Sequence, residues 1–342
     1  YEIGSGLVGS EMCIRDRLGL TGGGTMQVEA AGQENAYVDT SSYEQLYKLY
    51  EDYFKLGIAC QAMDHWNDPT AEIGNQEKEE LINRMFNSMT FGNELKPAYN
   101  FDASSENLFK VDFAAEEMLE WAKENNMKVR GHVLVWHSQV DPSIFAIDYQ
   151  AYADGKLTKS DTAKLDEECL VDREELLARL KRYIYGVLEY TYKNGYADVI
   201  YAWDVVNEAA DENQYDGLRR SYWYQIIGPD YLYYAFLYAR EAETLYAKQY
   251  ASLYGLDADT DDLSSIQPKL FYNDYNEWFG SRSDAIIHFL TEEPWNENHE
   301  KVKSSVINPD GDGTIYGDGL LDGIGMPVSY THLRAHETGA YL

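Results

Sequence analysis

The chain has 342 residues, 44% of them hydrophobic and 25% charged, which is a globular composition with room for one large α/β barrel. Its formal net charge of −31 would repel phosphate backbones and argues against a nucleic-acid partner. The chain lacks a run of roughly 18 apolar residues, which excludes a membrane span, and its three cysteines lack the spacing of a disulfide scaffold or a zinc site.

The two ends of the chain differ in pattern from its middle. Residues 1–17 and 327–342 have no clear hydrophobic period, and both resemble translated sequencing-adaptor read-through. We expect neither end to belong to the fold, and we exclude both from the fold prediction as one would exclude a tag or a vector-derived segment. For the same reason we assign no site role to Cys13, His332, His336 or Glu337. Residues 18–40 are rich in glycine and are predicted to be a linker or the end of an upstream domain.

From residue 41 onward, helical and strand patterns alternate. Helical periodicity predicts helices at 41–55, 77–87, 109–125, from 173 onward, at about 229–250 and at 285–293. Apolar runs between them predict strands at 56–60, 88–95, 128–136, 199–206, 269–277 and 320–326.

Two of these helices have a more detailed pattern. In the helix at 109–125, one face is predicted to hold Phe113, Met118, Trp121 and Ala122. Before the helix from Arg173, Asp172 and Glu175 have the spacing of a capping box. The apolar stripe of that helix consists of Leu177, Leu180, Ile184, Val187 and Leu188.

The order of these elements predicts the fold class. Six strand–helix units follow one another without a Gly-x-Gly-x-x-Gly fingerprint after the first strand, which favours an α/β barrel over a dinucleotide-binding sheet. A TIM (β/α)8 barrel needs eight strands. Residues 41–326 are therefore predicted to form an incomplete barrel with about six of the eight strands.

Polar residues gather at the carboxyl ends of four predicted strands, where β/α barrels place their chemistry. They are Asn93, Glu94, Lys96, His132, Trp136, His137, Gln139, Asp204, Asn207, Glu208, Asn273, Asp274, Tyr275 and Asn276. Asp204 is favoured as a buried, hydrogen-bonded acid, and His137 equally fits a core histidine. Asn93 and Asn276 fit turn caps. Glu208 is harder to explain structurally, because it ends an apolar strand and follows an amide.

An asparagine beside a strand-end glutamate suits the cleavage of glycosidic bonds. Asn207 can hold a ring hydroxyl while Glu208 protonates the glycosidic oxygen, if its surroundings keep the acid protonated near neutral pH. The 30 Tyr and 7 Trp residues also suit stacking on sugar rings, although many must belong to the core.

In order and spacing, the segments at these strand ends resemble glycoside hydrolase family 10, the endo-1,4-β-xylanases. The segments are FGNELKP (91–97), VRGHVLVWHSQ (129–139), YAWDVVNEA (201–209), LFYNDYN (270–276) and DGIGM (322–326). The resemblance implies retaining hydrolysis of internal β-1,4-xylosidic bonds by two carboxyl groups about 5–5.5 Å apart. It also implies xylan or xylo-oligosaccharide as the partner, no cofactor, no metal, a monomer, and action outside the cell or at its surface.

The same resemblance assigns roles to individual residues. Glu208 matches the general acid/base. The matches to sugar-binding residues are Asn93, Lys96, His132, Trp136, Gln139, Asn207 and Tyr275. Supporting roles fall to Glu94, Asp204 and Asn273.

The chain departs from the family pattern in three respects. After GIGM the motif does not continue into Gln and His. The nucleophilic glutamate of strand seven and the aromatic cover from strand eight are absent, so we expect the chain as written to be inactive. WHSQ is followed by VDPSIF, and residues 148–170 have the pattern of a longer acidic loop.

Two alternative functions stay open at this stage. One is a carbohydrate-binding protein without turnover, and the other is a different barrel β-glycosidase such as a β-glucanase. A calcium-loop pattern begins with Asn308, Asp310, Asp312 and Gly313. Gly319 occupies the position where a glutamate should close that loop, so the pattern predicts a surface turn and no metal site.

Overall fold

The computed structural model describes residues 44–62, 70–148, 169–276, 280–291 and 314–325. The chain divides into two units, residues 1–43 and 44–342, and all described residues lie in the second. The predictions for residues 1–17, 18–40 and 327–342 lie outside the described residues, as do the calcium-loop pattern at 308–313 and most of the acidic loop.

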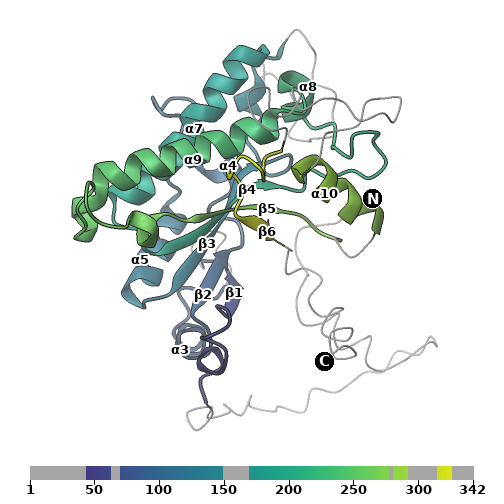
Figure 1. Cartoon of the computed structure of the whole chain (residues 1–342). Helices are drawn as coiled ribbons and strands as arrows, with labels where there is room; N and C mark the ends of the chain where they lie inside the picture. Colours follow the sequence, from purple (N-terminus) through teal and green to yellow (C-terminus); the bar gives the residue numbers. More distant parts are fainter. Residues whose placement is uncertain (1–43, 63–69, 149–168, 277–279, 292–313, 326–342) are drawn as a thin grey trace, which may run out of the picture. The chain divides into compact units, whose positions relative to one another are not determined.

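Six parallel strands form one sheet in the order β1-β2-β3-β4-β5-β6 (Figure 1). They are β1 Gly57–Cys60, β2 Ser88–Phe91, β3 Lys128–Trp136, β4 Ile200–Asn207, β5 Lys269–Asn273 and β6 Gly323–Gly325. All six predicted strands are present, but β2, β5 and β6 are shorter than the predicted 88–95, 269–277 and 320–326. Within the described residues, β1 pairs only with β2 and β6 only with β5, so the sheet is open at both edges, as an incomplete barrel predicts.

Helices follow the strands in the alternation expected of a β/α fold. The α-helices are α3 Gln76–Met85, α4 Pro97–Asn100, α5 Phe113–Glu124, α7 Arg173–Lys193, α8 Tyr222–Ile227, α9 Tyr231–Tyr250 and α10 Gly280–Thr291. Short 3₁₀ helices lie at η1 Leu46–Leu49, η2 Pro142–Phe145, η4 Ala251–Tyr254 and η5 Leu263–Ile266. The long helices α7 and α9 pack against each other, and α9 contacts β4 and β5 (Figure 1).

The predicted capping box before α7 forms only in part. The Asp172 carboxylate accepts a hydrogen bond from the Glu175 amide at 2.9 Å, which satisfies one unpaired donor of the first turn. The Glu175 carboxylate accepts instead from Arg179 Nε at 2.7 Å, one turn further along the helix. The cap is therefore one-sided.

The predicted helix at 41–55 is wrong over its described part. There the chain forms only η1 and a run of turns, and large side chains such as Tyr53 and Phe54 are exposed. Short helices gain most of their stability from packing an apolar face. Residues 44–55 bury no apolar residue within the described part of the chain, so periodicity alone does not stabilise a helix.

The predicted apolar face of α5 is wrong at Phe113, whose side chain is 60% exposed. At 100° per residue, Phe113 lies about 140° around the helix from Met118. The face that packs against the sheet consists of Ala114, Ala115, Met118, Leu119 and Ala122.

Strand β4 lies at the centre of the sheet and is buried along nearly its whole length, as predicted for a parallel strand covered on both faces. Its Trp203 is fully buried and pairs in register with Gly131 of β3. A Cβ atom at residue 131 would lie 2.3 Å from the Trp203 ring, so only glycine fits there. This close packing fixes β3 against β4, the two strands that lead into the site.

A buried glutamate on α9 makes the stability of the fold depend on pH. Glu243 is 2% exposed, and burial raises its pKa from 4.5 to about 7 although Arg240 lies 2.9 Å away. Between these two values the folded protein keeps a proton that the unfolded chain has lost, so stability falls as pH rises through this window. We expect Glu243→Gln to remove most of this fall, which is on the order of 1–3 kcal/mol.

The measurement is the free energy of unfolding in urea at pH 5 and pH 8. Glu241→Gln, on the exposed face of the same helix, should leave the fall unchanged. An equal fall in the wild type and in Glu243→Gln would contradict the assignment.

Candidate active site

Three polar side chains close a triangle of hydrogen bonds beyond β2 and β3. Lys96 Nζ donates to Asn93 Oδ1 at 3.0 Å and to Gln139 Oε1 at 2.6 Å, and Gln139 Nε2 donates to Asn93 Oδ1 at 3.0 Å. Lys96 Nζ also lies 5.1 Å from the ring centre of Trp136, within cation–π range. Burial lowers the pKa of Lys96 to about 8, and the nearby charges of Glu94 and Glu208 oppose that shift.

Glu208 directly follows β4 and faces the same tryptophan. Its Oε2 accepts a hydrogen bond from Trp136 Nε1 at 3.1 Å. Burial raises the pKa of Glu208, the Trp136 hydrogen bond lowers it, and the charge of Asp274 raises it again. The net shift is upward, which brings this carboxyl group closer to the working range of a general acid.

The backbone at three strand ends has the left-handed conformation. The φ angle is 45° at Gln139, 55° at Glu208 and 58° at Asn276. Such values are uncommon outside glycine and gather at functional sites, where neighbouring contacts hold them. At Glu208 the amide donates to the Asn273 carbonyl at 2.8 Å, and the carbonyl accepts from Arg219 Nε at 3.1 Å.

Asp204, which the sequence favours as a buried acid, lies inside β4 with 2% exposure. Its Oδ1 accepts from Arg130 at 2.6 and 2.9 Å, and its Oδ2 lies 2.8 Å from His132 Nδ1. Both partners lie on β3, so this acid ties β3 to β4 and orients His132.

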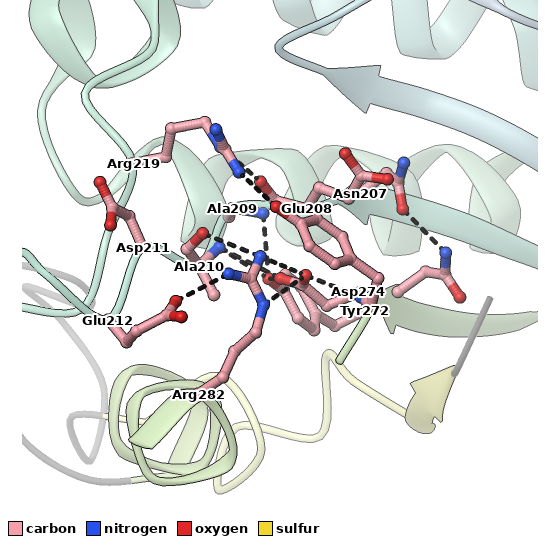
Figure 2. A network of polar contacts seen from close by, with 12 residues as sticks. Asn207, Glu208, Ala209, Ala210, Asp211, Glu212, Arg219, Tyr272, Asp274 and Arg282 are labelled. Carbon is pink, nitrogen blue, oxygen red and sulfur yellow. Dashed lines mark hydrogen bonds and ion pairs between the residues drawn. The ribbon is translucent and has the colours of Figure 1, made fainter. Parts of the chain in front are cut away.

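The other two strand-end acids are fully buried as well. Glu94 accepts from the amides of Ala62 and Asn93, at 3.1 and 2.9 Å. Asp274 accepts from Arg282, from the Tyr272 hydroxyl and from the Ala210 amide (Figure 2). Of the strand-end carboxylates that β2, β4 and β5 contribute to the described site, only Glu208 is partly exposed.

The remaining predicted residues lie beside this group. The side-chain amides of Asn273 and Asn207 lie 2.8 Å apart between the ends of β5 and β4. The Tyr275 hydroxyl accepts from Arg219 at 3.3 Å, so Arg219 links it to Glu208. Through these contacts the structure joins all eleven predicted site residues into one network.

His137 belongs to the surroundings of the site. Burial, together with the charges of Arg219 and Arg282, lowers its pKa to about 3, so the ring is neutral at physiological pH. Its ring lies edge-on to Trp136 with 5.9 Å between centres. Its side chain is half-buried, so the interpretation of His137 as a core histidine stays a prediction.

Sequence reasoning missed four residues that hydrogen-bond to the site residues or to the turn after Glu208. They are Arg130, Arg219, Tyr272 and Arg282. A signal existed for Arg130, because a charge in the interior of a strand implies an oppositely charged partner on a neighbouring strand. Arg282 lies on α10, beyond the quoted motifs, and no pattern in the sequence connects it to β4.

Across the described ranges, no group of three or more His, Cys, Asp or Glu residues is arranged to hold a metal ion. No helix in the described part of the chain combines the length and apolar character needed to cross a membrane.

Comparison with known sequences agrees with this geometry. The sequence model for Glycosyl hydrolase family 10 matches residues 45–326. Endo-1,4-beta-xylanase A of Thermotoga maritima is 35% identical over 282 residues, covering 82% of this chain and 20% of that protein. Endo-1,4-beta-xylanase B of Butyrivibrio fibrisolvens is 32% identical over 286 residues, covering 81% of this chain and 34% of that protein. The chain thus spans a fifth to a third of the length of these curated relatives.

Solved structures give the same relationship. The endo-1,4-beta-xylanase from Caldicellulosiruptor owensensis superimposes with a TM-score of 0.54 at 29% identity, over 83% of this chain and 62% of that one. TsXylA, an intracellular xylanase from Thermoanaerobacterium saccharolyticum, superimposes with a TM-score of 0.55 at 29% identity, over 83% and 67%.

Proposed function

The chain belongs to glycosyl hydrolase family 10, and on that premise we propose that its site serves retaining hydrolysis of internal β-1,4-xylosidic bonds in xylan. The observation that carries this proposal is Glu208. It is a partly exposed acid of raised pKa at the end of a buried strand, with an asparagine before it and an indole N–H on its carboxyl group. Partial exposure and a raised pKa are the properties that protonation of a glycosidic oxygen requires, and the indole N–H holds the carboxyl group in place.

Each neighbouring residue has a role in this proposal. Glu208 donates its proton to the leaving oxygen and then takes one from the incoming water. Trp136 holds the carboxyl group by its indole N–H and offers its ring as a flat wall for a sugar. Asn93, Lys96 and Gln139 present amide and ammonium groups to sugar hydroxyls. Their mutual hydrogen bonds hold these groups in place before substrate arrives.

We further propose that the 342-residue chain alone does not complete the reaction. Retaining hydrolysis needs a second carboxylate that attacks the anomeric carbon. Within the described residues, the other acids at these strand ends are Glu94, Asp204 and Asp274, and each is buried and hydrogen-bonded to the protein. None of these three therefore reaches a bound sugar.

Xylan and its oligosaccharides are the proposed partners, and because xylan is a polymer outside cells, we place the action there or at the cell surface. Variants of the relative TsXylA have been solved with xylotriose and with xylotetraose, which makes such oligosaccharides suitable probes for this chain. The alternatives are a carbohydrate-binding protein without turnover and a β-glucanase.

The test is calorimetric titration of the full chain with xylotetraose and, separately, with cellotetraose. We expect xylotetraose to bind more tightly, and Trp136→Ala to weaken its binding roughly tenfold or more by removing the stacking wall and its hydrogen bond. Trp121→Ala, on α5 and outside the site, is the matched control and should bind as the wild type does. Equal affinity for cellotetraose would favour the β-glucanase, and no binding of either sugar would contradict the proposal.

A further inference from the structure

The turn after Glu208 is held by a buried group of side chains from β5 and α10. The Tyr272 hydroxyl accepts hydrogen bonds from the amides of Ala209 and Ala210, at 3.0 and 3.1 Å. Asp274 Oδ2 also accepts from the Ala210 amide at 3.1 Å, and the Tyr272 hydroxyl donates to it (Figure 2). Both amides that follow Glu208 are therefore fixed.

Arg282 reaches this group from α10 and is 4% exposed. Its Nε and Nη2 donate to Asp274 Oδ1 at 3.1 and 2.7 Å. Nη2 also donates to the Ala210 carbonyl at 3.0 Å, and Nη1 donates to Glu212 at 2.7 Å. Arg282 thus binds both Asp274, which directly follows β5, and the turn after β4 (Figure 2).

The charge of Arg282 makes this arrangement possible. Asp274 is fully buried, and a buried carboxylate needs an opposite charge and complete hydrogen bonding. With Arg282 beside it, Asp274 can accept from Tyr272 and Ala210. Without that cation, the buried carboxylate would draw in water, and its hydrogen bonds to the turn would rearrange.

The turn matters because Glu208 has a left-handed backbone, with φ at 55°. Residues other than glycine keep this conformation only where their surroundings impose it. The conformation sets the direction in which the Glu208 side chain leaves the strand, and so its 3.1 Å contact with Trp136.

We propose that Arg282 is a positioning residue for Glu208, acting through Asp274, Tyr272 and the Ala209–Ala210 turn. The inference rests on the proposed role of Glu208 as acid/base. It assigns to α10, which contributes no predicted site residue, the task of fixing the acid/base carboxyl group.

The experiment follows the indole N–H resonance of Trp136 during a pH titration of the full chain, with Trp136→Phe identifying the signal. In the wild type the resonance should move, which means that its chemical shift should change, as Glu208 titrates. Glu208→Gln should abolish that movement. In Arg282→Met we expect the movement to fall roughly threefold or more, because a hydrogen bond weakens steeply with distance and angle. Arg282→Lys should restore part of it, since the charge remains but the two-pronged contact is lost.

Two controls separate positioning from general damage. Arg220→Met removes a similar arginine–aspartate pair, with Asp216, from the loop after β4, and should leave the movement unchanged. The Trp223 indole, which donates to the Trp136 carbonyl at 3.0 Å, should keep its resonance in every variant. A folded Arg282→Met with the full wild-type movement would overturn the proposal.

If Arg282→Met does not fold, Tyr272→Phe provides the second test. It deletes only the hydroxyl that accepts from the Ala209 and Ala210 amides, and should reduce the movement in the same direction. Unchanged movement in that variant and in Arg282→Lys would overturn the proposal. Because the titration uses no sugar, a failure of xylotetraose binding would refute the proposed function without deciding the role of Arg282.

Discussion

Glu208→Gln is expected to slow strongly the transfer of sugar from α-xylobiosyl fluoride to a xylo-oligosaccharide acceptor by the 342-residue chain. An α-fluoride has the configuration of the covalent intermediate of a retaining enzyme, so it enters the reaction after the step that needs the second carboxylate. The acceptor hydroxyl attacks the anomeric carbon, fluoride leaves as the anion, and the Glu208 carboxylate takes the hydroxyl proton. Loss of this base should cost roughly 10²–10⁴-fold in rate.

Fluoride release and product mass are the two measurements for this prediction. In the wild type the rate should rise with pH, because Glu208 acts here as a base and must first lose its proton. Since its pKa is raised, the rise should lie above the ordinary value of 4.5. Glu241→Gln, on the exposed face of α9, should transfer sugar at the wild-type rate. A Glu208→Gln variant that keeps the rate would remove Glu208 from the mechanism.

Asp204→Ala is expected to cost roughly 2–3 kcal/mol of folding free energy, because it leaves the Arg130 guanidinium, whose side chain is 23% exposed, without its partner. Asp204 is the acid that joins β4 to Arg130 and His132 on β3. The measurement is urea unfolding at pH 7. Glu241→Ala breaks an exposed pair with Lys181 and should cost about 0–1 kcal/mol. Equal losses in both variants would show that Asp204 does not hold the two strands together.

The sequence was sufficient to predict the strands and the gathering of the candidate site residues at one end of the sheet. Apolar runs such as 199–206 are typical of strands covered on both faces, and in a β/α barrel the residues after them share one end of the sheet. The Asn207–Glu208 pair and the residues of β2 and β3 could be found from this rule alone. Periodicity failed at 41–55, where a helical pattern occurs without a surface to bury it.

Which of the strand-end acids is partly exposed, and which are buried and bound to the protein, could not be predicted in the same way. Glu94, Asp204, Asp274 and Glu208 all end predicted strands and have the same chemistry. Burial and hydrogen-bond partners distinguish them, and those depend on side chains far away in sequence, such as Ala62 for Glu94 and Arg282 for Asp274. Arg282 itself had no local signal, because a charge on a helix is most often solvated.

The left-handed backbone at Gln139, Glu208 and Asn276 has a consequence for engineering this chain. Glycine adopts positive φ at little steric cost, whereas the side chains of Gln139 and Glu208 disfavour it, and Asn276 tolerates it better. A selection for heat resistance without a requirement for catalysis would favour glycine at Gln139 and Glu208. Thermostabilised variants would then lose the proposed acid/base and a proposed sugar-binding amide while the barrel core stayed intact.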